Sequence, residues 1–330
     1  MSENSVQDDS PSGDFERLTN QPDPRQPLVV IIGPTAVGKT ELAIQLAIRM
    51  KGEIVSADSR LLYRGMDIGT AKPTLDQRQQ VPHHLIDVAN PDHIWSLTVF
   101  KNKARQAINE IHARKYLPFM VGGTGQYVRA IVEDWQIPKV MPDLELRHAL
   151  ENWSEIVGKE GLHARLAVLD PKAAKKIDAR NLRRTIRALE VIFHSGKKFS
   201  LQKVRGKPTY NLILIGLNLP REILYQQIDH RIDAMLEQGL IDEVQELLAK
   251  GYSPELPSFS AIGYREVIDY LQGKTTLDEA IMLIKRHTRQ FVRRQANWFK
   301  LDDPSISWFE MKNQPLPEIE SLLRCKLQLH

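Results

Sequence analysis

The chain has 330 residues, of which 42% are hydrophobic and 26% charged, so it can bury a large core in two domains or in one domain with an insert. Its one cysteine, Cys325, excludes an internal disulfide and a cysteine-based zinc site. Because no apolar run approaches the roughly 20 residues of a membrane span and no signal-peptide pattern opens the chain, we expect a cytoplasmic protein without a membrane partner.

The net charge of +4 hides two strongly basic segments. Residues 172–207 contain twelve Lys or Arg and two acids, and residues 285–300 contain six Lys or Arg and no acid. Positive charge gathered in this way favours a polyanionic partner. Two solvated helix faces would give the same composition, so charge alone leaves both interpretations open.

Residues 1–26 are rich in Ser, Asp, Gln and Pro and have little periodic apolar content, which predicts a disordered leader. Five apolar residues at 28–32 then predict a buried strand that leads into a phosphate-binding loop with the spacing G-x4-G-K-T. Its glycines let backbone amides turn toward phosphate oxygens, Lys39 adds a positive charge, and the Thr40 hydroxyl can hold Mg²⁺. The predicted diphosphate-binding residues are Gly33, Pro34, Thr35, Ala36, Val37, Gly38, Lys39 and Thr40.

Two further predicted strands, at 53–57 and 118–121, also end in small or polar residues. Asp58 follows the first strand, and the second breaks into two glycines and Thr124. Residues just past the carboxyl ends of strands line the ligand crevice of an open α/β sheet, so we expect Asp58 and Thr124 to face the phosphate loop. The alternatives are that Asp58 or Ser59 only caps a helix and that residues 122–125 form a plain turn.

From about residue 138 the pattern predicts only helices, at 142–157, 162–169, 181–193 and one restarting at Asp170. In the helix predicted at 181–193, an apolar face is expected from Leu182, Ile186, Leu189 and Phe193. The arginines of this helix then point toward its other faces. An apolar run at 213–217 can return to the parent sheet. We therefore predict an α/β fold with a phosphate-loop, kinase-like parallel sheet built from 27–139 and 206–330, and an all-helical insertion domain at 140–205.

The last third of the chain predicts helices at 221–249, 264–271 and 277–299. The helix predicted at 277–299 interleaves basic residues with Phe291, Trp298 and Phe299. Such a mixture suits a groove that follows a nucleic-acid backbone, although the aromatic residues can equally form the buried face of the helix.

With these residues assembled, the chain resembles the tRNA dimethylallyltransferase family, also called tRNA isopentenyltransferases, over essentially its whole length after the leader. The motifs that carry the resemblance are GPTAVGKT (33–40), SADSRLLYRGMDIGTAKP (56–73), HHLID (83–87), VGGTGQY (121–127), RALEV (187–191), RIDAMLEQGLIDEV (231–244), AIGYRE (261–266) and RRQANWF (293–299). The resemblance implies a monomeric enzyme that uses Mg²⁺. It would transfer the dimethylallyl group of dimethylallyl diphosphate to N6 of the adenosine immediately 3′ of the anticodon, in tRNAs reading codons that begin with U.

The resemblance also implies residue roles. Adenine's amino nitrogen is a poor nucleophile, so a carboxylate must accept its proton, and Asp58 is the predicted general base. Lys39, Thr124, Mg²⁺ on Thr40 and a basic residue are expected to stabilise the departing diphosphate. The basic residue is Arg147 by resemblance alone, since its local sequence suggests only an exposed helix residue. The implied tRNA contacts are Asp58, Ser59, Arg60, Leu61, Arg183, Arg184, Thr185, Ile186 and Arg187.

Three rival functions remain open at this point. A phosphate-loop small-molecule kinase shares the core but does not need two basic segments. An isopentenyltransferase acting on free adenine nucleotides leaves the insert and the basic helices largely superfluous. A non-enzymatic RNA-binding module leaves the phosphate loop unexplained.

Overall fold

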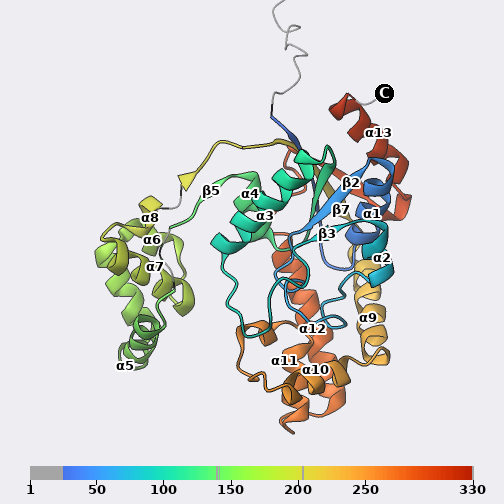
Figure 1. Ribbon diagram of the computed structural model, residues 1–330. Helices are drawn as coiled ribbons and strands as arrows, with labels where there is room; N and C mark the ends of the chain where they lie inside the picture. Colours follow the sequence, from blue (N-terminus) through green and yellow to red (C-terminus); the bar gives the residue numbers. More distant parts are fainter. Residues whose placement is uncertain (1–24, 139, 141, 203, 329–330) are drawn as a thin grey trace, which may run out of the picture.

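The computed structural model of the protein describes residues 25–138, 140, 142–202 and 204–328; the predicted leader falls outside these ranges except for its last two residues. The core is a six-stranded parallel sheet with strand order β3-β2-β4-β1-β7-β8 (Figure 1). Its strands are β1 (Pro27–Ile32), β2 (Gly52–Ser56), β3 (His83–His84), β4 (Leu117–Val121), β7 (Asn211–Asn218) and β8 (Ile306–Glu310). Strands buried on both faces read as continuous apolar runs, which is why β1, β4 and β7 were predictable. The predicted parallel α/β core is confirmed.

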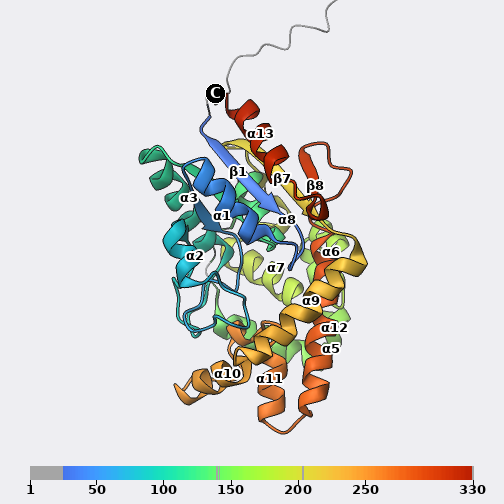
Figure 2. The same ribbon diagram turned by 90° about the vertical axis from the view of Figure 1, so that its right-hand side faces the viewer.

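Helices cover both faces of this sheet. Helices α1 and α13 contact each other, as do α3 and α4, and Figures 1 and 2 show the two pairs on opposite sides of the strands. The helices around the sheet are α1 (Lys39–Arg49), α2 (Leu75–Gln80), α3 (Leu97–Ala113), α4 (Gly125–Val132) and α13 (Leu316–Leu327). Within the described part of the chain, none of the helices is both long and apolar enough to cross a membrane.

The predicted insert is a cluster of helices set to one side of the sheet (Figure 1). It contains α5 (Leu144–Leu169), α6 (Pro171–Lys176), α7 (Leu182–Ser195) and α8 (Phe199–Gln202). These helices bury an apolar cluster of their own, which includes Leu150, Leu162, Leu166 and Leu189. A short antiparallel pair, β5 (Trp135–Gln136) and β6 (Val204–Arg205), forms where the chain leaves the core and returns to it. A separate core supports an insertion domain, whose limits of 140–205 stay a prediction.

The two helices predicted at 142–157 and 162–169 are both present within α5, which is interrupted at Gly158, where φ is 77°, ψ is 162° and the backbone is not helical. One detail of the predicted insert differs in the structure. The prediction that Phe193 belongs to the buried face of α7 is wrong, because its side chain is 51% exposed. The buried face of α7 instead includes Thr185 and Glu190, which are both fully buried. Phe193 lies outside this face.

The C-terminal helices lie beyond the carboxyl ends of the sheet strands, with α9 and α12 side by side (Figure 2). They are α9 (Arg221–Glu237), α10 (Leu240–Ala249), α11 (Tyr264–Leu271) and α12 (Leu277–Gln295), with short 3₁₀ turns η1 (Pro257–Ser260) and η2 (Met311–Asn313) elsewhere in this part of the chain. The single helix predicted at 221–249 is broken at Gly239, whose φ of 96° is left-handed. The helix predicted to reach residue 299 ends at Gln295. The C-terminal helices therefore cover the carboxyl edge of the sheet, and the candidate site lies between this edge and these helices.

Candidate active site

The phosphate loop follows β1 and leads into α1. Gly38 caps α1 with a left-handed φ of 92°, and a side chain at Gly33 would place its Cβ 2.6 Å from the Leu217 carbonyl oxygen. Both positions therefore require glycine. The Lys39 ammonium donates a 2.7 Å hydrogen bond to the Pro34 carbonyl within the loop. The loop thus presents amides, a lysine and a helix N-terminus to the same space, which is a favourable arrangement for an anion.

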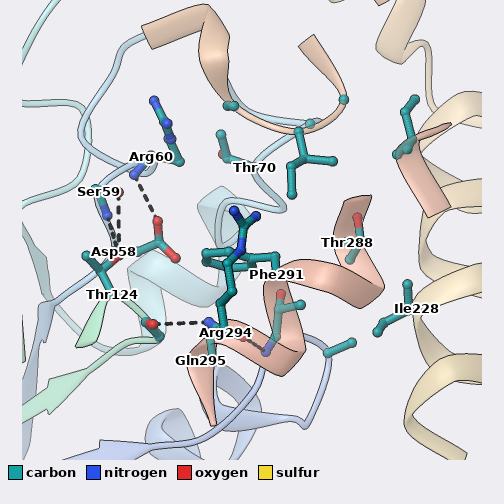
Figure 3. A pocket seen from close by; sticks show the side chains of 18 of the residues that line it. Asp58, Ser59, Arg60, Thr70, Thr124, Ile228, Thr288, Phe291, Arg294 and Gln295 are labelled. Atoms are coloured by element: carbon teal, nitrogen blue, oxygen red, sulfur yellow. Dashed lines mark hydrogen bonds between the residues drawn. The ribbon is translucent and has the colours of Figure 1, made fainter. Parts of the chain in front are cut away.

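Asp58 and Thr124 lie side by side because β2 and β4 are neighbours in the sheet (Figure 3). One carboxylate oxygen of Asp58 accepts a 2.8 Å hydrogen bond from the Arg60 amide, and its other oxygen has no hydrogen-bond partner among the described residues. The Thr124 hydroxyl accepts a 3.1 Å hydrogen bond from the Ser59 amide. Asp58 therefore has one carboxylate oxygen fixed and one available for a ligand.

Two adjoining cavities meet at Asp58. The first, about 280 Å³, is lined by five residues of the phosphate loop, namely Thr35, Ala36, Gly38, Lys39 and Thr40. The second, about 570 Å³, has a partly apolar wall formed by α9, α10 and α12. The residues that line both cavities are Thr35, Ala36, Asp58, Thr70 and Arg231. The apolar part of the second cavity comes from Ile228, Ile232, Met235, Leu240, Ile284 and Phe291. A diphosphate in the first cavity and an apolar group in the second would therefore both reach Asp58.

A groove of about 1250 Å³ runs between the insert and helices α11 and α12. Its basic and imidazole side chains come from both sides: Arg147, His148, Arg183 and Arg187 from the insert, and Arg265, His287 and Arg294 from the C-terminal helices. Arg183, Ser260, Ile262 and Arg294 line this groove and also the 570 Å³ cavity. The groove, the larger cavity and the phosphate loop thus form one continuous series of spaces.

Arg231 is a site residue that reasoning from sequence patterns did not single out. It lies on α9, lines both cavities by the phosphate loop, and interacts electrostatically with Asp58 and with Lys39. Burial lowers the pKa of the Arg231 guanidinium, whereas the Asp58 carboxylate opposes that effect. Its only sequence signal is its place at the start of the 231–244 motif, because helical periodicity does not distinguish it from the other arginines.

Glu243, in the same motif as Arg231, holds a segment of the cavity wall in place. Its carboxylate accepts hydrogen bonds from the amides of residues 67–69, at 2.7 to 3.2 Å, and from the Tyr264 hydroxyl. Tyr264 is completely buried. This clamp holds the segment that places Thr70 in the walls of both cavities.

The side chains predicted to contact RNA differ in their exposure and in whether they are already hydrogen-bonded. Arg183 and Arg184 are exposed on α7, and Leu61 lines the smaller cavity. Arg60 is anchored by 3.1 Å hydrogen bonds to the Pro257 and Ser258 carbonyls at the mouth of the larger cavity.

Two residues predicted to contact tRNA, Thr185 and Ile186, have little exposed surface. Thr185 is 0% exposed and Ile186 is 4% exposed, since both lie on the buried face of α7, but Ile186 still lines the groove between the insert and helices α11 and α12. Contact of these two residues with tRNA stays a prediction. Arg187, in the same helix, pairs with Glu190.

Arg147 lines the groove and neither of the two cavities beside the phosphate loop. Its guanidinium pairs with Glu190 through bonds of 2.8 and 3.0 Å, inside the insert. Burial works against ionisation of Glu190, but hydrogen bonds from Arg147 and Arg187 hold the pKa of its carboxyl below the usual value. The catalytic role of Arg147 stays a prediction, and in this structure the arginine beside Lys39 and Asp58 is Arg231.

The residues of the smaller cavity fit Mg²⁺ held largely by a substrate. Among the described residues, no three His, Cys, Asp or Glu side chains gather in a way that could hold a metal ion alone. Thr40 and Asp58 line the same cavity. Mg²⁺ commonly takes one or two protein ligands and completes its shell with substrate phosphates and water. Thr40 is therefore a suitable single protein ligand for Mg²⁺ on a bound diphosphate.

Comparison with known proteins agrees with this geometry. Residues 61–302 match the family model described as IPP transferase. A protein named tRNA dimethylallyltransferase from Roseiflexus sp. (strain RS-1) is 53% identical over 274 residues, which cover 83% of this chain and 90% of that protein. A protein of the same name from Halalkalibacterium halodurans is 43% identical over 311 residues, or 92% of this chain and 98% of that protein.

Two solved structures resemble the whole arrangement. The full-length tRNA isopentenylpyrophosphate transferase from Bacillus halodurans aligns with a TM-score of 0.69 at 43% identity, covering 92% of this chain and 97% of that one. A eukaryotic dimethylallyltransferase acting on tRNA aligns with a TM-score of 0.76 at 28% identity, covering 91% of this chain and 77% of that one. The chain therefore belongs to the IPP transferase family.

Proposed function

We propose that this protein is a tRNA dimethylallyltransferase. It transfers the dimethylallyl group of dimethylallyl diphosphate to N6 of the adenosine immediately 3′ of the anticodon, in tRNAs reading codons that begin with U, and releases diphosphate. The observation that carries the proposal is the position of Asp58, at the junction of a phosphate-loop cavity and a partly apolar cavity that continues into a groove lined by five arginines and four glutamates. The names of the curated relatives support it.

The donor diphosphate binds in the smaller cavity. The phosphate-loop amides, Lys39 and Arg231 neutralise its charge, and the charge increases as the allylic carbon–oxygen bond breaks. Thr40 would hold Mg²⁺, which when bound supplies further compensation of negative charge at the leaving oxygens. The five-carbon group extends toward Ile228, Ile232 and their apolar neighbours in the larger cavity.

The acceptor adenine enters the larger cavity from the groove and approaches Asp58 there. Its N6 lone pair is delocalised into the ring, so the nitrogen attacks effectively only if its proton is removed. The free carboxylate oxygen of Asp58 accepts that proton as the nitrogen–carbon bond forms. The carbon–oxygen bond breaks, and the diphosphate leaves with the electron pair. Thr124, fixed beside Ser59, helps to orient the reacting groups.

The RNA lies in the groove between the insert and the C-terminal helices. Arginines from both sides line it, and such side chains bind phosphates and stack on unpaired bases. The bases of an anticodon loop are unpaired, so turning one adenosine out of the stack costs only a few kcal/mol. Arg183 and Arg294 mark the passage from the groove into the larger cavity.

A transfer assay tests the proposal. The protein is incubated with unmodified tRNA, Mg²⁺ and radiolabelled dimethylallyl diphosphate, and the digested RNA should contain labelled N6-dimethylallyladenosine. Label on free adenosine monophosphate instead would identify a nucleotide isopentenyltransferase. Transfer of labelled γ-phosphate from ATP to a small acceptor, without prenyl transfer, would identify a kinase.

The salt dependence of tRNA binding should identify the RNA-facing arginines. Replacing Arg183 and Arg184 with Ala should make the slope of log affinity against log salt shallower by about one to two units, because each neutralised phosphate contributes roughly 0.7 to 0.9. Binding is measured by fluorescence at several salt concentrations. The control is Lys103→Ala with Lys326→Ala, which removes the same charge from exposed residues of α3 and α13. Equal slopes for wild type and the Arg183/Arg184 variant would mean that these arginines are only a solvated helix face.

Diphosphate binding should weaken above pH 8 because of Lys39. Burial lowers the pKa of its ammonium to about 8, the Asp58 carboxylate opposes this effect, and Arg231 adds to it. A bound diphosphate favours the charged form, so above pH 8 binding must take up a proton, and the dissociation constant should rise by at most about tenfold per pH unit.

Calorimetry at pH 8.5 in buffers of different ionisation enthalpy measures this proton uptake directly. Lys39→Met should bind diphosphate more weakly and without the uptake. Identical proton uptake in Lys39→Met would assign the titration to another group.

A further inference from the structure

Gln295, the last residue of α12, joins two loops of the site. Its side-chain oxygen accepts a 2.9 Å hydrogen bond from the Thr35 amide in the phosphate loop. Its side-chain nitrogen donates a 3.0 Å hydrogen bond to the Gly123 carbonyl, next to Thr124. Gln295 is only 9% exposed, and Figure 3 shows it at the base of the cavity below Arg294. The oxygen and the nitrogen of one side-chain amide are thus both hydrogen-bonded to backbone groups, the oxygen in the loop after β1 and the nitrogen in the loop after β4.

The contact leaves no space for substitution. A Cβ at Gly123 would lie 2.3 Å from the Gln295 side-chain nitrogen, and a Cβ at Gly125 would lie 2.1 Å from the Trp298 ring. The Arg129 guanidinium also donates a 3.0 Å hydrogen bond to the Trp298 carbonyl. The end of α12 is therefore packed directly onto the loop that carries Thr124.

The same helix lines the groove proposed for RNA. Arg294, which precedes Gln295, lines both the groove and the larger cavity, and His287 lines the groove about two turns earlier. A single rigid helix thus contacts the RNA surface along its length and the phosphate loop at its end. A shift of α12 on RNA binding would act on the Thr35 and Gly123 loops through the Gln295 amide.

We propose that Gln295 is a positioning residue that couples RNA binding on α12 to diphosphate binding in the phosphate loop. The inference rests on the proposed function for its substrates. Gln295 fixes the phosphate loop and the Thr124 loop in one relative position, so that RNA which holds α12 in place also favours the loop arrangement that binds diphosphate. By thermodynamic linkage, diphosphate then favours RNA binding by the same factor.

The coupling can be measured without turnover. The affinity for inorganic pyrophosphate with Mg²⁺ is determined by calorimetry, with and without a saturating, unmodified anticodon stem-loop RNA. In the wild type the RNA should tighten pyrophosphate binding at least about fivefold. In Gln295→Met that factor should fall below about twofold. In Gly123→Ala, whose new methyl group would lie 2.3 Å from the Gln295 side-chain nitrogen and so displace it, the factor should be intermediate.

Gln226→Met is the matched control, since Gln226 is exposed on α9 and lines none of the three spaces. It should keep the wild-type factor. A purely structural role for Gln295 would lower the melting temperature and leave the factor unchanged, and that result would overturn the proposal. A wild-type factor of one would overturn it as well. The transfer assay on the wild type reports separately on the proposed function, because the coupling measurement needs no reaction.

Discussion

Asp58→Ala is expected to lower the rate of prenyl transfer to tRNA by about 10² to 10⁴, the range typical of a lost general base. The variant should bind tRNA within a few fold of the wild type, because the arginines of the groove remain in place. The physical reason is that Asp58, with one carboxylate oxygen free, lies where the phosphate-loop cavity and the larger cavity meet. Single-turnover transfer of labelled dimethylallyl to unmodified tRNA measures the chemical step directly.

Asp58→Asn separates proton transfer from loop structure. The asparagine side-chain oxygen can still accept the hydrogen bond of the Arg60 amide, which keeps the loop after β2 in place. The amide cannot take the N6 proton, so Asp58→Asn should be nearly as slow as Asp58→Ala. An asparagine variant with close to wild-type turnover would show that Asp58 shapes the loop and takes no proton.

The predictable part of the fold follows from how strands are buried. β1 and β7 lie inside a parallel sheet, so their residues form continuous apolar runs that mark a strand. β3, β5 and β6 have two residues each, which is too short for any periodicity. β8 lies at the sheet edge and mixes Ser307 and Glu310 with aromatic residues, so its composition did not identify it.

The predictable part of the site follows from the same sheet. β1, β4 and β2 are adjacent, so the residues after them had to meet, and Lys39, Thr124 and Asp58 were placed together from sequence alone. Arg231 and Gln295 come from helices whose position depends on tertiary packing. Thr35 and Gln295 are 260 residues apart, and no local pattern reports a contact across such a distance. Family resemblance assigned the second cation to Arg147, which pairs with Glu190 in the insert.

Arg231→Ala is expected to lower the transfer rate by about 10² to 10³, comparable to the loss of one donor that stabilises a developing anion. Arg231 is the second cation beside the phosphate loop, where it interacts with Asp58 and Lys39. Its loss would leave the departing diphosphate with the phosphate-loop amides, Lys39 and any Mg²⁺ that Thr40 holds. Arg231→Lys should recover part of the rate, since it keeps the charge but loses the planar, multidentate geometry. Steady-state kinetics with varied dimethylallyl diphosphate will also show a raised KM for the donor.

Two further variants decide between the candidate cations. Arg221→Ala, at the exposed start of the same helix, should leave the transfer rate unchanged. Arg147→Ala should remove one of the two arginines that pair with Glu190, a fully buried acid, and so lower the stability of the insert and its affinity for tRNA. The donor KM distinguishes the roles, because only a residue at the diphosphate changes it. If Arg147→Ala raised the donor KM and Arg231→Ala did not, the cation that binds the leaving group would be Arg147, and the insert would have to close onto the phosphate loop during the reaction.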